Sequence, residues 1–206
     1  CLLSRGLGDV YKRQFNASIF ADYSNHKDSK EVIDELVNEH GFEESYVINV
    51  LKQAKKRKTA LNSVARPAEK TKTWDDYRAI FLKKKRISDG KKFIQNNITV
   101  LDRAEKEFGV PKEVITAILG VETDYGNIMG SYRVIDSLTT LGFDDPRRSK
   151  FFKSELIQFF ILTRENNLDI LKVKGSYAGA MGYGQFISSS YRAVSYTHLR
   201  AHETRG

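Results

Sequence analysis

Helical periodicity with few interruptions is the feature that most constrains how this chain can fold. Between residues 28 and 167, apolar side chains recur three or four residues apart, as they do on one face of an α-helix, whereas alternating apolar and polar runs are few and short. Only three prolines occur, and several glycines stand where periodic runs end, as expected of helix C-termini. The sequence therefore predicts a mainly α fold.

The expected helices can be placed from these patterns. Two short helices are predicted over 28–57, with Gly41 ending the first, and a loop or extended connection follows over 55–73. Thr73 is a candidate N-cap for the next helix, in which Trp74 should face inward. The remaining predicted helices cover 90–109, 111–125 and 147–167.

The two ends of the chain lack this periodicity. Residues 1–14 and 195–206 are similar to translated sequencing-adapter tails, so we expect them not to be native. Setting them aside lowers the formal net charge from +8 to +5 and removes Cys1, so the interior has no thiolate for a disulfide or a zinc site. We expect a helical N-terminal portion with its connection over 15–72 and a second domain over 73–194.

Two basic runs raise the question of nucleic-acid binding. They cover 55–58 and 83–86, lie on polar faces, and are not interleaved with aromatic residues. Solvated surface is the favoured interpretation, and a positive field that attracts an anionic polymer is the alternative. No apolar run approaches the ~20 residues needed to span a bilayer.

The stretch "TAILGVETDYGN", residues 116–127, ends an apolar helical stripe with an acid. Continuing the stripe by three or four residues reaches Glu122, which should therefore lie on the buried face or at its rim. Burial and the negative end of the helix dipole both disfavour an ionised carboxylate, and a protonated Glu can act as a general acid. The alternative is an outward-facing Glu paired with a Lys or Arg. The stripe consists of Val114, Ile115, Ile118 and Leu119.

A second carboxylate is not evident beside Glu122. Asp124 follows two residues later and should point to the opposite side of the helix, whereas the usual glycosidase arrangement uses two carboxyl groups.

The segment "GSYAGAMGYGQF", residues 175–186, combines small residues with groups that can bind a ligand. Its glycines allow the backbone to approach a ligand closely, and the Gln185 amide can both donate and accept hydrogen bonds. Tyr177 and Tyr183 offer apolar faces suited to sugar rings. A tightly packed turn between helices is the alternative interpretation.

These two segments carry a resemblance to a known family. "VPKEVITAILGVETDYGNIMGSYRVIDSLTTLGFDDPRRSKFF", followed by "KGSYAGAMGYGQFISSSY", resembles the membrane-bound lytic murein transglycosylase B family continuously over about 108–194. The resemblance implies a lysozyme-like α+β catalytic core, preceded by a helical N-terminal portion. That core would be incomplete at its C-terminus, because the family-like sequence stops at Val194.

The resemblance also implies an activity and the residues that perform it. Glu122 would be the sole catalytic acid/base of a lytic transglycosylase, which cleaves the MurNAc–GlcNAc β-1,4 bond of peptidoglycan without water and releases 1,6-anhydromuropeptides. The residues matched to substrate binding are Ser176, Gln185, Tyr183, Met181, Arg147 and Arg148. For Arg147 and Arg148, a structural role in capping or pairing is equally open.

The same resemblance sets expectations for cofactors, partners and location. The family's calcium loop of EF-hand type lies beyond "SSY", and no D-x-[DN]-x-[DN]-G loop occurs here, so no metal or other cofactor is expected in this chain. The expected partner is the peptidoglycan glycan strand rather than nucleic acid. A monomer in the periplasm is implied, outer-membrane associated through a lipid anchor of the longer protein. A lysozyme-type hydrolase and a non-catalytic peptidoglycan-binding module are the alternatives.

Overall fold

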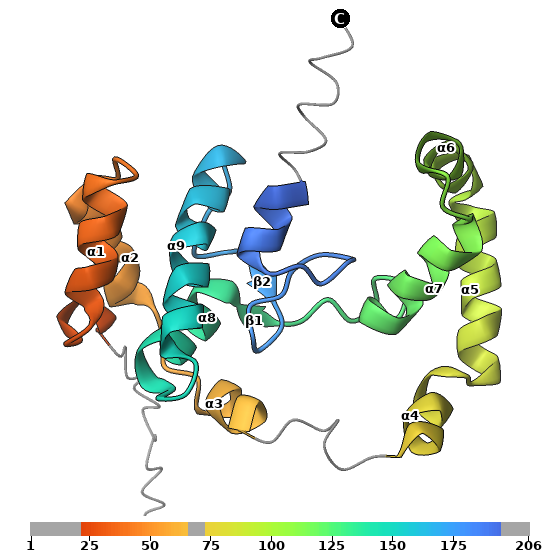
Figure 1. Ribbon diagram of the computed structural model, residues 1–206, viewed down its shortest axis with the longest axis horizontal. Coiled ribbons are helices and arrows are strands. Elements are labelled where there is room, and N and C mark those ends of the chain that lie inside the picture. The colour runs from red at the N-terminus through yellow and green to blue at the C-terminus, as the bar shows by residue number, and fades with distance from the viewer. Residues whose placement is uncertain (1–21, 66–72, 195–206) are drawn as a thin grey trace, which may run out of the picture.

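The computed structural model describes residues 22–65 and 73–194 (Figure 1). Helices dominate, as the sequence predicts, and two short strands pair in a single antiparallel sheet. No helix among these residues is long and apolar enough to cross a bilayer. In chain order the elements are η1 (Tyr23–Asn25), α1 (Ser29–Asn38), α2 (Glu44–Gln53), α3 (Lys58–Ala65), α4 (Trp74–Phe81), α5 (Lys84–Asn96), α6 (Ile98–Phe108), α7 (Lys112–Thr123), β1 (Tyr132–Arg133), α8 (Val134–Asp144), α9 (Ser149–Glu165) and β2 (Lys174–Gly175).

The helices form two groups that do not follow their order along the chain. In one group α1 packs on α2 and α9, α3 packs on α8, and α8 packs on α9; in the other, α5, α6 and α7 pack on one another. Figure 1 shows the second group, with α4, on the opposite side of the strand pair from α1 and α2. The domain boundary at 72/73 stays a prediction, but α8 and α9 belong with the helices that precede it.

The hydrophobic core lies almost entirely within the first group. Four aromatic and aliphatic side chains of α9 are at most 2% exposed, and apolar side chains of α1 and α2 close the core from the other side. The apolar faces expected for the first two helices are confirmed, and Gly41 ends α1 in the left-handed conformation (φ +64°). The α9 residues are Phe152, Leu156, Phe159 and Phe160.

Helix α8 is absent from the sequence-based predictions, although its apolar residues Val134, Ile135, Leu138 and Leu141 recur at helical spacing. All residues from Val134 to Phe143 are buried, so the polar residues of the helix face protein as the apolar ones do. The hydroxyl groups are satisfied within the fold; for example, Thr139 Oγ1 donates to the Ile135 carbonyl at 2.6 Å. The spacing of the apolar residues is visible in the sequence, whereas the burial of the polar residues between them is not.

Three other expectations about the helices require correction. The connection expected over 55–73 contains α3, whose Ala60 is buried in the core; residues 66–72 lie outside the described part. The helix expected over 90–109 is broken at Asn97, which separates α5 from α6. Thr73 does cap α4 through a capping box with Asp76, but Trp74 is 72% exposed rather than inward-facing.

Candidate active site

Helix α7 presents the candidate acid, Glu122, and is held in place by small residues. Its buried positions are Thr116, Gly120 and Thr123. A Cβ placed on Gly120 would lie 2.7 Å from the ring of Tyr125, so only glycine leaves room for that ring. The Tyr125 hydroxyl in turn donates to the Arg86 carbonyl of α5 at 2.8 Å. The turn after Glu122 is thereby fixed to α5.

The apolar stripe predicted on α7 does not form its buried face. Val114 and Ile118 are about half exposed, and Glu122, which continues the stripe, is exposed as well. Of the two expected positions for Glu122, the buried face and its rim, the buried face is therefore wrong, because the side chain is exposed. The physical reason is that α5 and α7 approach each other through glycines, with the Tyr125 ring against both Gly90 and Gly120.

The Glu122 carboxylate is available for chemistry. Among the described residues it forms no hydrogen bond and no ion pair, so the outward-facing Glu paired with Lys or Arg is not what the structure contains. Asp124 behaves as the sequence suggests. It takes a left-handed conformation (φ +50°), and its Oδ1 lies 3.6 Å from Nε of Arg86, which makes it an ion-pair partner for α5.

Thr123 connects the Glu122 helix to the glycine-rich segment. The side chain is fully buried, and its Oγ1 lies 3.1 Å from the Leu119 carbonyl and 3.3 Å from the Tyr183 carbonyl, so the single hydroxyl proton can be donated to either. The same oxygen accepts from the Gly126 amide at 3.0 Å. The two segments singled out in the sequence, 60 residues apart at this contact, are therefore joined directly beside Glu122.

Close packing makes further connections between the chain that follows α7 and the glycine-rich segment. Gly126 has φ +90°, and a Cβ there would lie 2.3 Å from the ring of Tyr183. Gly130 has φ +88° and would similarly meet the backbone of Gly175 at 2.1 Å. Strand β1 pairs with β2, with Tyr132 opposite Gly175. Glycine is required at 126 and 130 both for the left-handed backbone and for space.

Of the predicted substrate-binding residues, four lie in the glycine-rich segment that contacts α7, and three of these four are at least partly exposed. Tyr183 is half exposed beside Gly126. Gln185, at φ +49°, donates from Nε2 to the Gly182 carbonyl at 2.9 Å, and no described donor reaches its Oε1. Ser176 Oγ accepts from two backbone amides of its own loop, which leaves its proton free to be donated. Their role in substrate binding stays a prediction.

The other three predicted residues have structural surroundings. Met181 is 5% exposed and belongs to the hydrophobic core. Arg147 and Arg148 lie at the turn between α8 and α9, in the helix group away from α7 (Figure 1). The Arg148 guanidinium stacks over the ring of Phe151 at 4.5 Å, and Arg147 lies 3.7 Å from an oxygen of Asp145. These contacts fit the structural alternative, and no described contact brings the two arginines to Glu122; their role in substrate binding stays a prediction.

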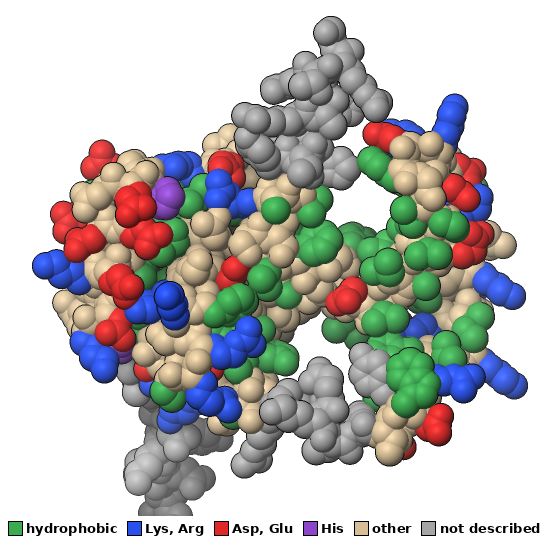
Figure 2. All heavy atoms as spheres, in the orientation of Figure 1, with side chains coloured by type: hydrophobic (Ala, Val, Ile, Leu, Met, Phe, Trp, Pro, Cys, Tyr) green, Lys and Arg blue, Asp and Glu red, His purple; other side chains and the backbone are tan. Residues whose placement is uncertain are grey.

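An exposed apolar surface surrounds the junction between α7 and the glycine-rich segment. Figure 2 shows hydrophobic side chains gathered on the face between the two helix groups. Aromatic faces of this kind stack on the apolar faces of sugar rings, whereas the neighbouring backbone amides and carbonyls can hydrogen-bond sugar hydroxyls. The exposed side chains from these segments are Val121, Ile128, Met129, Tyr177, Tyr183 and Phe186.

Thr123 and Gly126 are the site residues that the sequence analysis missed. Both lie within "GVETDYGN", where the sequence-based expectations concern only the two carboxylates, Glu122 and Asp124. The one available signal for Thr123 was its spacing: it follows the acid directly and lies three residues after Gly120, on the same face of the helix. Its partner, the Tyr183 carbonyl, is a backbone group, and no sequence pattern identifies such an acceptor.

Comparisons with known proteins identify the mainly α fold as that of the lysozyme-like lytic transglycosylases. A family model described as "Transglycosylase SLT domain" matches residues 24–198. The chain therefore belongs to the transglycosylase SLT domain family.

Individual relatives give the same result. Membrane-bound lytic murein transglycosylase B of Escherichia coli K12 is 39% identical over 180 residues, which cover 83% of this chain and 50% of that protein. Catenated lytic transglycosylase SltB1 from Pseudomonas aeruginosa superposes with a TM-score of 0.80 at 45% identity, over 84% of this chain and 57% of that one. Escherichia coli Slt35 in complex with bulgecin A gives 0.77 at 39% identity, over 84% and 55%. The chain spans about half the length of the curated relative it matches.

Proposed function

We propose that this chain is part of a lytic transglycosylase that cleaves the MurNAc–GlcNAc β-1,4 bond of peptidoglycan and leaves a 1,6-anhydromuramoyl end. Family membership supports the reaction class. The observation that carries the proposal is the placement of Glu122, an exposed carboxylate without a partner among the described residues, next to the segment tied to α7 by Thr123.

In the proposed mechanism one carboxyl group acts twice. Glu122, protonated, donates its proton to the glycosidic oxygen as the bond from that oxygen to C1 of MurNAc breaks. The oxygen of the MurNAc C6 hydroxyl then bonds to C1, and its proton passes to the Glu122 carboxylate. The acid is regenerated, and no water is consumed. Because the substrate supplies the nucleophile, the reaction needs no second carboxylate, consistent with Asp124 being paired with Arg86.

The remaining site residues are proposed to bind the glycan. The exposed ring of Tyr183 would stack on a sugar, and the free Oε1 of Gln185 would accept a hydrogen bond from a sugar hydroxyl or from an N-acetyl amide. Ser176 would donate its free proton. Met181 would contribute from beneath this surface, because it is buried.

Digestion of purified murein sacculi tests the proposal. The protein should release muropeptides that mass spectrometry identifies as 1,6-anhydro species, each lighter by one water than the product of hydrolysis. Products with only reducing ends would instead establish the lysozyme-type hydrolase. Sacculus binding without any release would establish the non-catalytic module.

Thr123 offers a test of the junction itself. Thr123→Val keeps the shape of the side chain but removes the hydroxyl that bonds Tyr183 and Gly126. We expect kcat for anhydromuropeptide release to fall about tenfold or more, since misplacement of a catalytic group by about 1 Å can cost 10²-fold. Thr123→Ser, which keeps the hydroxyl, should retain most of the parent rate. Equal rates for all three proteins would show that the Thr123 hydroxyl does not position Glu122.

We further place the longer protein in the periplasm, where peptidoglycan lies, and associate it with the outer membrane through a lipid anchor. Support comes from the Escherichia coli relative, a membrane-bound lytic murein transglycosylase. We expect it to act as a monomer on glycan strands. The calcium seen with Slt35 belongs to that protein, and a calcium site in the longer form of this one is proposed by analogy only.

A further inference from the structure

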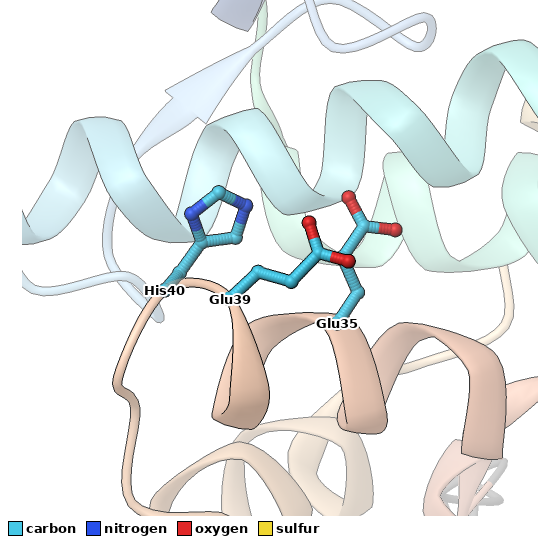
Figure 3. A group of neighbouring side chains, drawn as sticks. All are labelled: Glu35, Glu39 and His40. Carbon is cyan, nitrogen blue, oxygen red and sulfur yellow. The ribbon is translucent and has the colours of Figure 1, made fainter.

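Three potential metal ligands meet at the C-terminal end of α1. Glu35 lies in the last turns of the helix, Glu39 is its C-cap residue, and His40 follows directly. Each offers one ligand atom, and the three atoms lie within 4.8 Å of one another. Figure 3 shows the two carboxylates and the imidazole projecting from the same side of the helix end and turned toward one another. The spacing explains this, since positions i and i+4 share one face of a helix.

Neither carboxylate is neutralised by a basic side chain. Among the described residues, Glu35 and Glu39 form no salt bridge, although Glu31 on the same helix is paired with Lys153. Two like charges at i and i+4 repel each other on one face of a helix and destabilise it. A cation bound between them would remove that repulsion.

The charge around these residues also favours a cation. Over residues 28–44 the sequence has seven Asp and Glu residues and a single lysine, although the whole chain has a formal net charge of +8. Figure 2 shows this concentration of acidic side chains around a histidine over α1 and α2. The negative end of the α1 dipole lies at the same place and adds to the attraction.

The backbone that carries the ligands is fixed from both sides. Gly41 donates to the Val37 carbonyl at 3.1 Å and Phe42 to the Leu36 carbonyl at 3.0 Å, which closes the end of α1. Arg164 of α9 donates from Nη1 to the His40 carbonyl at 2.7 Å, while its guanidinium stacks over the Phe42 ring at 3.9 Å. Only side-chain rotation is then needed to bring the ligand atoms together.

We propose that Glu35, Glu39 and His40 form a zinc-binding site that clips the end of α1 to the turn leading into α2. A neutral imidazole with two carboxylate oxygens suits a borderline divalent ion such as zinc better than magnesium or calcium, which prefer all-oxygen sites. In a four-coordinate zinc site with bonds of about 2.0–2.2 Å, neighbouring ligand atoms lie roughly 3.3–3.5 Å apart, within reach of the long Glu39 side chain. Water would complete the coordination.

The proposal does not depend on the activity assigned to Glu122. The α1 end and α7 belong to different helix groups and lie on opposite sides of the strand pair (Figure 1). A zinc site here departs from the sequence-based expectation of no metal, which rested on the missing thiolates and the missing calcium loop; E-x-x-x-E-H matches neither pattern.

Calorimetric titration of the full chain with zinc chloride, with magnesium chloride in parallel, tests the site. We expect one equivalent of zinc to bind, magnesium to bind far more weakly, and zinc to raise the melting temperature. His40→Gln and Glu35→Gln should each weaken that equivalent by about tenfold or more. His198 and His202, which lie outside the described residues, are present in the parent chain and in every variant. A difference in zinc affinity between two of these proteins therefore reports on the proposed site.

Asp34→Asn is the matched control, because Asp34 is an exposed acid of the same helix outside the trio. Its zinc affinity should equal that of the parent chain. If His40→Gln binds zinc as tightly as the parent, or if Asp34→Asn loses as much affinity as Glu35→Gln, the zinc is held by diffuse attraction and the proposed site is wrong. Absence of a zinc-specific equivalent in the parent would also overturn the proposal.

Discussion

Replacement of Glu122 by glutamine is expected to lower the rate of anhydromuropeptide release about 10²–10⁴-fold, the range over which a positioned general acid or base contributes to catalysis. Glutamine has nearly the same shape but can neither give a proton to the glycosidic oxygen nor take one from the C6 hydroxyl. Because Glu122 is exposed and has no partner among the described residues, the melting temperature should not fall. Sacculus digestion followed by mass spectrometry measures the rate.

Glu113→Gln is the control for this experiment. Glu113 is an exposed acid in the first turn of the same helix, so its replacement removes one charge from α7 without touching the site. Its product rate should equal that of the parent chain. A Glu122→Gln protein that releases product at the parent rate would show that another group transfers the proton.

Replacement of Asp136 by asparagine is expected to destabilise the fold by about 3 kcal/mol or more. Its carboxylate is fully buried at the start of α8 and accepts hydrogen bonds from the guanidinium groups of Arg57 and Arg133 and from the Lys55 amide. Arg133 also donates to the Gln53 carbonyl. Asparagine would leave two guanidinium groups without their counter-charge and would turn a donor toward other donors.

Urea denaturation measures this loss, with Asp102→Asn as the control. Asp102 pairs with Lys112 at 2.7 Å, but its side chain is about half exposed, so the control should change the free energy of unfolding by less than about 1 kcal/mol. Similar losses in the free energy of unfolding for the two variants would mean that the buried ion pairs of Asp136 stabilise the fold no more than an exposed one does.

Most helices could be predicted from residue types, but the extent of their burial could not. The sequence places α1 and α2, which each bury one face, and also α9, which is buried on most sides between Glu155 and Thr163. Helix α8 was not predicted; its apolar residues recur at helical spacing, but its polar residues are buried as well, which the sequence does not indicate. Helix α3 lies in a stretch rich in Lys, Arg, Thr and Ser, where tertiary packing of Ala60 against the core outweighs weak local preference.

The candidate site was predictable in its parts but not in its assembly. The acid and the glycine-rich segment are recognisable from residue types, and resemblance to a family links them. The contact that joins them depends on Thr123 and on a backbone carbonyl, neither of which periodicity can identify. The predicted burial of Glu122 failed because periodicity selects the most apolar face of α7, whereas contact with α5 uses Gly120 and the ring of Tyr125.

The separation of the helices into two groups implies that the chain does not fold in the order in which it is synthesised. Helix α3 finds its partner α8 only after residues 66–133 have been made, and α1 finds α9 only after residues 39–148 have been made. Helices α5, α6 and α7 contact near neighbours in the chain and can pack as soon as they leave the ribosome. The apolar side chains of α1 that pack against α9 therefore stay uncovered until most of the chain has been made.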